Sequence, residues 1–430
     1  MKIIENPSAQ SWQELLERPA MDSQYLDQAI EDIFFAVRRT GDQALREFTR
    51  TFDGVQLEEL VVPAREIEDS RNAVSEPLKQ AIQNAALNIR KFHLAQQTPA
   101  VSLETAPGVQ CWQKPVPIQR VGLYIPGGSA PLFSSVLMLA IPAQIAGCKE
   151  IILCTPPAKD GKVNPAILYA ASISGVTRIF TVGGAQAIAA MAFGTLSIPA
   201  VNKIFGPGNQ FVTAAKQMVQ KLGVAIDLPA GPSEVLVMAD ETADPDFVAS
   251  DLLSQAEHGP DSQVILVSSD RQLAEDTTEA MKQQLQALPR REMIEKSLQS
   301  CKIIVMTRPD EMIALVNEYA PEHLIIAMRN AGEMADQILN AGSVFIGNYT
   351  PESAGDYASG TNHTLPTNGF AKAYSGVNLD AFQKKITFQQ ITAAGLQQLG
   401  DTLQQMAGAE NLQAHKMAVK IRLDKIKQGV

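Results

Sequence analysis

The sequence has little of what binding to nucleic acid or membranes requires. Aromatic residues are only 6% of its 430 residues, and 46 acidic against 36 basic side chains give a formal net charge of −10. Nucleic acids and anionic membranes bind basic surfaces. No uninterrupted apolar run approaches the ~18 residues of a membrane-spanning helix. We therefore expect neither nucleic acid nor a membrane among the partners of this protein.

The cysteines are few and scattered. There are four, Cys111, Cys148, Cys154 and Cys301, and no two of them form a CxxC motif. Such a set fits a reducing cytosol better than a disulfide framework. The segment "MKIIENPSAQSWQELL" also lacks the basic region and apolar core of a signal peptide. These features predict a cytoplasmic protein.

What the sequence does contain is a repeated alternation of short β-rich runs and alanine-rich helical stretches. The first set of runs is "RVGLYIPGG", "EIILCTPP", "RIFTVGG", "NKIFGPG" and "EVLVMAD", and the second is "SQVILVSS", "CKIIVMT", "EHLIIAM" and "GSVFIGN". Strand, turn and helix in repetition are typical of parallel sheets with crossover helices. The length of the chain suggests roughly two to four domains.

The fold class that this pattern predicts is α/β, with two incomplete Rossmann-like parallel-sheet domains. We place a helical N-terminal region at residues 1–114, the first sheet domain at 115–240 and the second at 241–375. The remaining segment, 376–430, is rich in Gln, Leu and Lys and lacks strands. It is predicted to be a helical appendage that packs on another surface.

Three glycine-rich turns follow predicted strands of the first domain. They are Gly127-Gly128, Gly183-Gly184 and Gly206-Pro207-Gly208, and nearby polar side chains are Tyr124, Gln186 and Asn209. Such turns can direct backbone N–H groups at a phosphate, in the crevice at the carboxyl ends of parallel strands. A strict GxGxxG motif is missing, because Phe211 stands in place of the third glycine. The turns predict a nucleotide site; the alternative is tight βα turns with simple helix caps.

A possible metal site involves residues from three segments. In "SQAEHG", Gln255 and His258 share one face of a helix end. Taken alone, a histidine at a helix end is usually a capping donor. The stretch "GNYTPESAGDYASGTNHTLPT" is a long aperiodic loop that adds Asp356 and His363, and loops of this length are usually functional. Zinc accepts nitrogen and oxygen ligands from such side chains.

The third segment is "GAENLQAHK", which carries Glu410 and His415. Residues five apart on a regular helix point roughly 140° away from each other. Both side chains reach one site only if the helix breaks, for example at Gly408, or if the site wraps around it.

An acid–base pair opens the run "EHLIIAM", where Glu322 and His323 follow Pro321. Adjacent strand residues point to opposite faces, but the backbone at a strand entry is irregular. A carboxylate and an imidazole together suit a site that runs two proton transfers. The alternative interpretation is a surface acid beside an edge histidine.

Five motifs, taken together and in order, resemble those of the histidinol dehydrogenase family. They are "FGPGNQFVTAAKQ", "DLPAGPSEVLV", "DLLSQAEHGPDSQ", "YAPEHL" and "TPESAGDYASGTNHTLP". The resemblance covers essentially the whole chain, including "AENLQAHK" in the tail. Their length and unusual composition make the resemblance specific.

The resemblance implies a zinc- and NAD-dependent enzyme of histidine biosynthesis, which oxidises L-histidinol through the aldehyde to L-histidine and reduces two NAD. One zinc ion per subunit would be bound by Gln255, His258, Asp356 and His415. The substrate would be held by these four together with Ser233, His323, His363 and Glu410. Glu322 and His323 would be catalytic, and Tyr124, Gln186 and Asn209 would line the NAD site. The family is a homodimer with exchanged C-terminal tails, so Glu410 and His415 would complete the partner's site.

Other interpretations fit parts of the pattern. A zinc-dependent hydrolase would use the same metal cluster with metal-bound water and no nucleotide. A non-catalytic nucleotide-binding regulator would need neither Glu322 nor His323. A thiohemiacetal route would need Cys148 or Cys154 as nucleophile, but both lie beside an apolar strand, where cysteine is usually buried.

Overall fold

The computed structural model describes residues 3–18, 23–127, 131–229 and 231–429. The chain divides into two compact units. Unit 1 comprises Met1–Gln96 and Ile118–Phe382, and unit 2 comprises Gln97–Pro117 and Gln383–Val430. No helix within the described residues is long and apolar enough to cross a membrane.

Unit 1 contains a five-stranded parallel sheet with the strand order β6-β5-β4-β7-β8. Its strands are β4 (Arg120–Tyr124), β5 (Glu150–Thr155), β6 (Arg178–Thr181), β7 (Lys203–Phe205) and β8 (Ala225–Ile226). The connecting helices are α6 (Phe133–Ala146), α7 (Pro165–Ser174), α8 (Gly184–Phe193) and α9 (Gln210–Lys221). Apolar runs form these strands because both faces of the sheet are covered.

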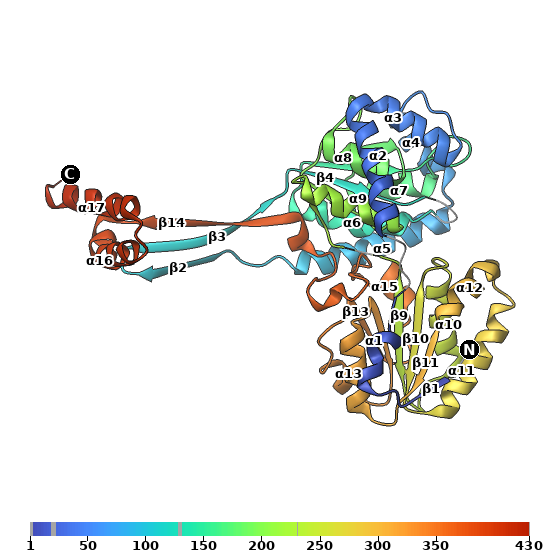
Figure 1. Ribbon diagram of the computed structural model, residues 1–430. Helices are drawn as coiled ribbons and strands as arrows, with labels where there is room; N and C mark the ends of the chain where they lie inside the picture. The colour runs from blue at the N-terminus through green and yellow to red at the C-terminus, as the bar shows by residue number, and fades with distance from the viewer. Residues whose placement is uncertain (1–2, 19–22, 128–130, 230, 430) are drawn as a thin grey trace. The chain divides into compact units, whose positions relative to one another are not determined.

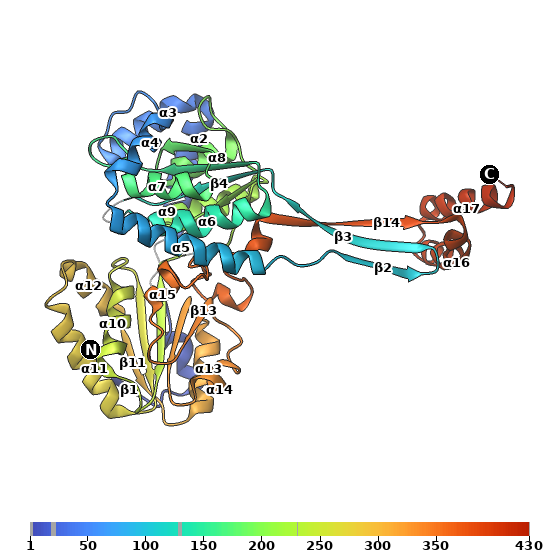
Figure 2. The ribbon, with the colours of Figure 1, turned by 180° about the vertical axis from the view of Figure 1, so that it is seen from behind.

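Helices from the N-terminal region complete this covering (Figures 1 and 2). On one side, α2 (Ser23–Thr40) and α3 (Asp42–Phe48), which continues into η2 (Thr49–Asp53), pack with α8 and α9. On the other side, α4 (Ala64–Ala73) and α5 (Glu76–Ala95) pack with α6 and α7. The N-terminal region predicted to be helical over residues 1–114 therefore does contain helices, but residues 3–5, 101–106 and 109–114 are in strands.

The second sheet of unit 1 has six parallel strands in the order β1-β11-β10-β9-β12-β13. They are β1 (Ile3–Glu5), β9 (Glu234–Ala239), β10 (Gln263–Ser268), β11 (Lys302–Val305), β12 (His323–Ala327) and β13 (Ser343–Ile346). Thus β9 belongs to this sheet although it precedes residue 240, where the sequence placed the boundary. The N-terminal strand β1 joins the same sheet.

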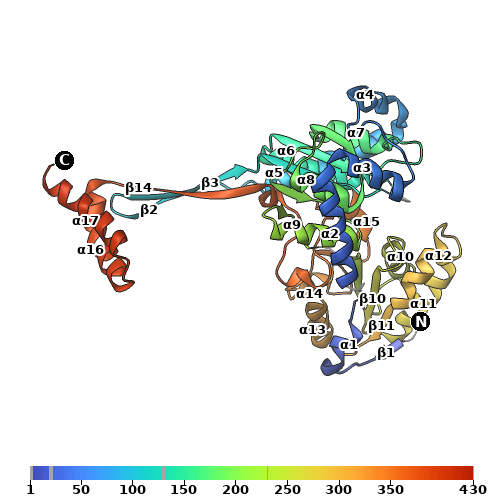
Figure 3. The same ribbon diagram turned by 45° about the horizontal axis from the view of Figure 1, so that its top comes forward.

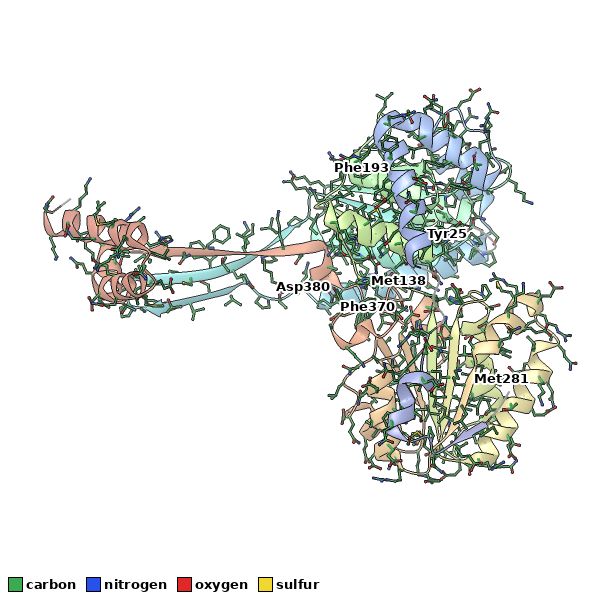
Figure 4. The ribbon with its side chains drawn as sticks, viewed as in Figure 1. Tyr25, Met138, Phe193, Met281, Phe370 and Asp380 are labelled. Atoms are coloured by element: carbon green, nitrogen blue, oxygen red, sulfur yellow. The ribbon has the colours of Figure 1, made fainter. Side chains whose placement is uncertain are left out.

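Helices cover both faces of the second sheet as well. One face carries α10 (Pro245–Ala256), α11 (Arg271–Leu285) and α12 (Arg291–Ser297), and Met281 of α11, labelled in Figure 4, is part of that core. The other carries α13 (Pro309–Tyr319), α14 (Ala331–Ala335) and the region of α1 (Trp12–Leu15). The short helix α15 (Glu352–Tyr357) packs against α10. The 3-10 turns are η1 (Ala9–Ser11), η3 (Leu298–Ser300), η4 (Phe370–Lys372) and η5 (Leu379–Phe382).

Unit 2 is a three-stranded antiparallel sheet followed by two helices (Figure 3). The sheet order is β14-β3-β2, with β2 (Val101–Ala106), β3 (Val109–Pro117) and β14 (Gln383–Ile391). The helices α16 (Ala393–Ala409) and α17 (Gln413–Lys427) pack together. The prediction that the tail lacks strands is wrong, because β14 pairs along its whole length with β3.

The reason for this error is visible in the strand itself. In "KKITFQQI", apolar residues are few and the polar ones outnumber them, so the alternating pattern of a half-exposed strand is weak. The ring of Phe388 stacks on that of Trp112 in β3, with centroids 5.3 Å apart. The partner strand, distant in sequence, supplies the pairing that the local pattern did not indicate.

The predicted α/β class with two incomplete Rossmann-like sheets is confirmed. Apart from β1, both sheets share one chain order, in which the first strand is central and the third and fifth lie at the edges. The direction of winding reverses between β4 and β7 in the first sheet and between β9 and β12 in the second. Such reversals open a crevice at the carboxyl ends of the strands, where ligands bind in many α/β proteins.

Candidate active site

The predicted acid–base pair lies where β9 and β12 begin, at the amino ends of two neighbouring strands. His323 is the first residue of β12. Its Nδ1 lies 3.1 Å from the carbonyl oxygen of Glu234, and the backbone N–H of Glu234 donates to the Glu322 carboxylate at 2.8 Å. Both side chains therefore contact one residue, Glu234, although they are adjacent in the chain.

The turn before β12 explains this arrangement. The helix α13 ends at Ala320, which has a left-handed φ of +54°, and Pro321 follows it. The N–H of Gly342 donates to the carbonyl of Pro321 at 2.9 Å, and a Cβ at Gly342 would lie 2.5 Å from the carbonyl oxygen of Glu322. Glu322 therefore precedes the regular strand, and its side chain is not bound by the alternation of strand side chains between the two faces of the sheet.

The carboxylate of Glu234 is itself held in place by several hydrogen bonds. The Arg18 guanidinium donates to both carboxylate oxygens, at 2.6 and 3.0 Å, and also to the carbonyl of Tyr319 at 2.7 Å. The backbone N–H of Asn368 donates to the same carboxylate at 2.7 Å. Burial raises the pKa of Glu234, and the Arg18 charge opposes this rise. The residue that holds Glu322 and His323 is therefore anchored by a partly buried ion pair.

The imidazole of His323 has a defined hydrogen-bonding state. Because the carbonyl of Glu234 can only accept, Nδ1 is the protonated nitrogen, and Nε2 of the neutral ring carries the lone pair. Nε2 is buried without a hydrogen-bond partner and lies 3.5 Å from Oδ1 of Asp356. In its neutral form the ring can therefore accept a proton at Nε2 from a bound molecule.

Carboxylates surround His323. Oε2 of Glu322 and Oε1 of Glu352 lie 3.5 and 3.9 Å from its Nδ1. Burial lowers the pKa of His323, but the charges of Glu352 and Glu322 and the contact with Asp356 outweigh it and raise that pKa well above its usual value. This buried site therefore carries strong negative charge, as expected for a site that binds a cation.

A group of possible metal ligands adjoins this histidine. The ligand atoms of His258, Glu352 and Asp356 all lie within 4.8 Å of one another. Gln255 sits in the last turn of α10, and its amide is fully buried with no partner for either its oxygen or its nitrogen. Unpartnered buried amides are costly and rare. Oxygen and nitrogen donors of this kind fit a zinc ion.

The capping alternative for His258 is not what the structure shows. The backbone N–H of His258, rather than its imidazole, donates to the carbonyl of Gln255 at 3.2 Å, and the imidazole is exposed next to Asp356 and Glu352. The helix end is closed by backbone contacts, so the ring remains available as a ligand.

The pKa values of the two carboxyls in this group move in opposite directions. Burial raises the pKa of Glu352 to about 8, against the opposing charge of His323. Burial also acts to raise the pKa of Asp356, but hydrogen bonding to His323 and the charges of His323, His363 and His258 hold it below its usual value. Opposite shifts in neighbouring carboxyls are typical of functional sites.

His363 lies in the loop that follows α15. Its Nδ1 donates to the backbone carbonyl of Asp356 at 2.8 Å, so Nε2 accepts from the Ser135 hydroxyl at 3.0 Å. Burial lowers the pKa of His363, which favours this neutral form. The preceding residue, Asn362, donates to the carbonyl of Met138 in α6 at 2.6 Å; Met138 is labelled in Figure 4. The loop is thereby tied to α6.

The remaining predicted substrate residues fall in two places. Ser233 directly precedes Glu234 at the start of β9. Glu410 and His415 belong to unit 2, where α16 ends at Ala409 and α17 begins at Gln413. The helix thus breaks at Glu410–Leu412, just after the predicted Gly408, so that the two side chains are not on one regular helix.

The predicted nucleotide residues lie at the carboxyl edge of the first sheet. Tyr124 ends β4, and its hydroxyl accepts from the N–H of Gly184 at 3.1 Å, while burial raises its pKa to about 12. Gln186 is buried in the first turn of α8. Asn209 is the N-cap of α9, accepting from Val212 N–H at 3.1 Å. Of the three glycine turns, the one at residues 127–128 is described only to Gly127.

The turn after β7 is held by a buried ion pair. Gly206 has a φ of +130°, and a Cβ there would lie 2.0 Å from the carbonyl oxygen of Tyr124. Its N–H donates to Asp227 and its carbonyl accepts from Lys216, both at 2.8 Å. Lys216 and Asp227 are themselves 2.5 Å apart and buried. The turn is thereby fixed beside Tyr124, at the point where the winding of the sheet reverses.

Sequence reasoning did not single out Arg18, Ser135, Glu234 or Glu352. Glu234 carried one usable signal, since an acid at the head of the apolar run "EVLVMAD" must be buried with a partner. Glu352 lies in the functional loop already recognised, four residues before Asp356 and thus on the same helix face. Arg18 and Ser135 are distant in sequence, and only the fold brings them to the site.

Known proteins resemble this chain along almost its entire length. The sequence model of a family described as "Histidinol dehydrogenase" matches residues 16–423. The histidinol dehydrogenase of Bacteroides thetaiotaomicron is 56% identical over 427 residues, covering 99% of this chain and all of the relative. That of Escherichia coli K12 is 52% identical over 424 residues, covering 98% and 97%. The crystal structure of histidinol dehydrogenase from Elizabethkingia anophelis superposes with a TM-score of 0.96, at 52% identity and 99% coverage of both chains.

Proposed function

The chain belongs to the histidinol dehydrogenase family of NAD-dependent oxidoreductases, and we propose on this basis that it oxidises L-histidinol through L-histidinal to L-histidine, in the last steps of histidine biosynthesis. Each oxidation would reduce one NAD, and the reaction would depend on zinc. The observation that supports this most strongly is the position of His323, whose free Nε2 adjoins the cluster of His258, Glu352 and Asp356.

Zinc would be held by Gln255, His258 and Asp356, with His415 as the further ligand that the family motif indicates. When bound, it would anchor the unprotonated imidazole and amine of the substrate and offset the carboxylate charge around His323. Ser233, His363 and Glu410 would hold the rest of the substrate. Tyr124, Gln186 and Asn209 would bind NAD at the carboxyl edge of the first sheet.

In the first oxidation, Nε2 of His323 accepts the alcohol proton of histidinol while a hydride leaves the same carbon for NAD. The contact between Nδ1 and the Glu234 carbonyl keeps the ring in the orientation and tautomer that this requires. One NADH, one proton and the aldehyde result.

In the second oxidation, Glu322 removes a proton from water as its oxygen adds to the aldehyde, and His323 returns the proton it took in the first step to the aldehyde oxygen, which gives the hydrated diol. His323 then accepts a proton from the diol while a second hydride goes to a second NAD, giving the acid. The aldehyde stays bound throughout, and the buried surroundings of Glu322 and His323 protect it from other reactions.

Unit 2 supports a dimer with exchanged tails. It exposes apolar side chains, which are Met406 on α16, Leu412 at the N-cap of α17, and Met417 and Ile421 on α17. Exposed apolar side chains of this kind favour a surface that another chain covers. We propose that Glu410 and His415 complete the site of the partner subunit.

Mixing inactive His415→Ala and His323→Ala subunits should then restore part of the activity, and no recovery after verified subunit exchange would contradict a shared site.

Purified protein supplied with L-histidinol and excess NAD tests the proposed reaction. Absorbance at 340 nm should rise by two NADH for each histidinol consumed, with L-histidine as the product. A zinc hydrolase, the alternative, would produce no NADH.

We also propose a cytoplasmic location, which suits the four unpaired cysteines.

A further inference from the structure

We propose that Arg18 is a positioning residue for the reaction, because its guanidinium fixes the two backbone segments that hold Glu322 and His323. It acts through Glu234 and Tyr319 rather than by contact with the reacting atoms. This role rests on the proposed function, in which Glu322 and His323 carry the proton transfers. It adds a determinant of kcat from the N-terminal segment, outside both strands of the acid–base pair.

The first segment that Arg18 fixes is the start of β9. Its Nε and Nη2 donate to the two carboxylate oxygens of Glu234 at 2.6 and 3.0 Å, and the two side chains are only 17% and 3% exposed. A bidentate pair of this kind fixes the plane of the carboxylate as well as its distance. The backbone of the same Glu234 donates to Glu322 at 2.8 Å and lies 3.1 Å from Nδ1 of His323. A shift of this one residue therefore moves both groups.

The second segment is the end of α13, which leads into the acid–base pair. Nη2 of Arg18 also donates to the carbonyl of Tyr319 at 2.7 Å, and the guanidinium carbon lies 4.0 Å from the centroid of the Tyr319 ring. A cation over an aromatic face is attracted to it. Ala320 and Pro321 alone separate Tyr319 from Glu322. One guanidinium thus holds the turn that presents Glu322 and the strand that orients its carboxylate.

Arg18 is itself held in place by its surroundings. Gln263, the first residue of β10, accepts from the hydroxyl of Tyr319 at 2.7 Å and donates to the carbonyl of Glu17 at 3.0 Å. Leu16 is buried in the same apolar core as Tyr319. The segment that carries the guanidinium is therefore anchored to the second sheet immediately before Arg18.

The geometry of Arg18 can be separated from its charge. Arginine has a planar group with several donors at fixed angles, whereas lysine has one compact ammonium on a flexible chain. Arg18→Lys therefore keeps a positive charge beside Glu234 but loses the planar contact with both carboxylate oxygens and the carbonyl of Tyr319. Because Glu234 is not left as an unpaired buried charge, the variant is expected to fold.

The main experiment compares the steady-state kinetics of Arg18→Lys and wild type with L-histidinol and NAD. Arg18→Lys should lower kcat roughly 10- to 100-fold, because misplacement of a group by about 1 Å can cost about 100-fold in rate. The KM values for L-histidinol and NAD should stay close to those of wild type, since the lost interaction acts in the transition state. Unchanged kcat, or a loss that appears only in KM, would overturn the positioning role.

Two comparisons sharpen this result. With L-histidinal as substrate, Arg18→Lys should slow aldehyde oxidation as well, because the same residue holds Glu322 and His323; a normal rate would contradict the proposal. Arg308→Lys is the matched control, since Arg308 pairs with two exposed carboxylates at the other end of α13. It should have the kcat of wild type, and an equal fall in this control would also contradict the proposal.

A double variant tests whether the pair serves only to neutralise Glu234. Arg18→Met/Glu234→Gln removes both charges together, and the glutamine oxygen can still accept from the backbone N–H of Asn368. Its unfolding temperature should exceed that of Arg18→Met, because no buried charge is left unpaired. Its kcat should nevertheless stay as low as that of Arg18→Lys. A wild-type kcat in the double variant would show that the contacts of Arg18 do not position the acid–base pair.

The same measurements distinguish failure of this role from failure of the proposed function. If wild-type protein does not reduce NAD with L-histidinol, the proposed function is wrong. If it does, and Arg18→Lys has the same kcat, only the role of Arg18 is wrong. The zinc content of Arg18→Lys should equal that of wild type; a loss of zinc that accounts for the lower kcat would overturn the positioning role. All rates are measured at a temperature at which each variant is folded.

Discussion

His323 and Glu234 are joined by a contact of 3.1 Å between the imidazole Nδ1 and the backbone carbonyl oxygen. This contact assigns the ring proton to Nδ1 and leaves Nε2 as the basic nitrogen, facing Asp356. The N–H of the same Glu234 holds Glu322. One peptide therefore orients both groups that the proposed reaction uses for proton transfer.

We expect Glu322→Gln to slow aldehyde oxidation more than alcohol oxidation. The glutamine can still accept from the N–H of Glu234, so the position of the side chain is kept while its basicity is lost. Loss of a general base typically costs about 10²–10⁴-fold in rate. Supplying L-histidinal directly and measuring NADH formation isolates this step. Full activity with L-histidinal would contradict the role of Glu322.

We expect Cys148→Ala and Cys154→Ala to keep turnover close to that of wild type. Burial raises the pKa of Cys148 to about 12 and raises that of Cys154 further above its usual value, so neither is a thiolate near neutral pH. Steady-state kinetics with both substrates checks this. Complete loss of aldehyde oxidation in a folded variant would favour the thiohemiacetal route.

Lys216→Met should both destabilise the protein and weaken NAD binding. It leaves Asp227 buried and unpaired, which typically costs about 3–5 kcal/mol, and it releases the carbonyl of Gly206. The KM for NAD should rise more than the KM for L-histidinol. Lys221→Met, at the exposed end of the same helix, serves as control. An unchanged KM for NAD would show that the Gly206 turn lies outside the NAD site.

Stability should decrease on acidification below about pH 6.5, in part because of His93. Its ring is buried between the carbonyl of Ile89 and the amide of Asn362, and burial lowers its pKa. The unfolded chain then binds a proton that the folded chain excludes, so the free energy of unfolding falls as pH falls, by up to about 1.4 kcal/mol per pH unit. Urea unfolding at pH 7.5, 6.5 and 5.5 should show a smaller decrease for His93→Gln. An equal decrease in both proteins would show that His93 does not contribute to the loss of stability at low pH.

The sequence was informative where local pattern decides the structure. Buried apolar runs with glycine turns predicted both parallel sheets, because strands covered on both faces need no distant information to be recognised. The strands of unit 2 were missed because "KKITFQQI" becomes a strand only through its pairing with residues 109–117.

The same limit applies to the site. The spacing predicted that Gln255 and His258 lie close together at a helix end, and the structure places Gln255 in the last turn of α10 and His258 beside Asp356. Whether Glu322 and His323 face one cleft could not be read from adjacent positions, since it depends on Glu234, 88 residues away from Glu322. Glu352 was overlooked although it stands four residues before Asp356, because an acid in such a loop is usually exposed.

The most direct test of the account is a metal analysis combined with an assay of the same sample before and after chelation. We expect one zinc ion per subunit, reduction of NAD by L-histidinol, loss of that activity when zinc is removed and its return when zinc is restored. Undiminished oxidation of L-histidinol by protein shown to be free of metal would contradict it.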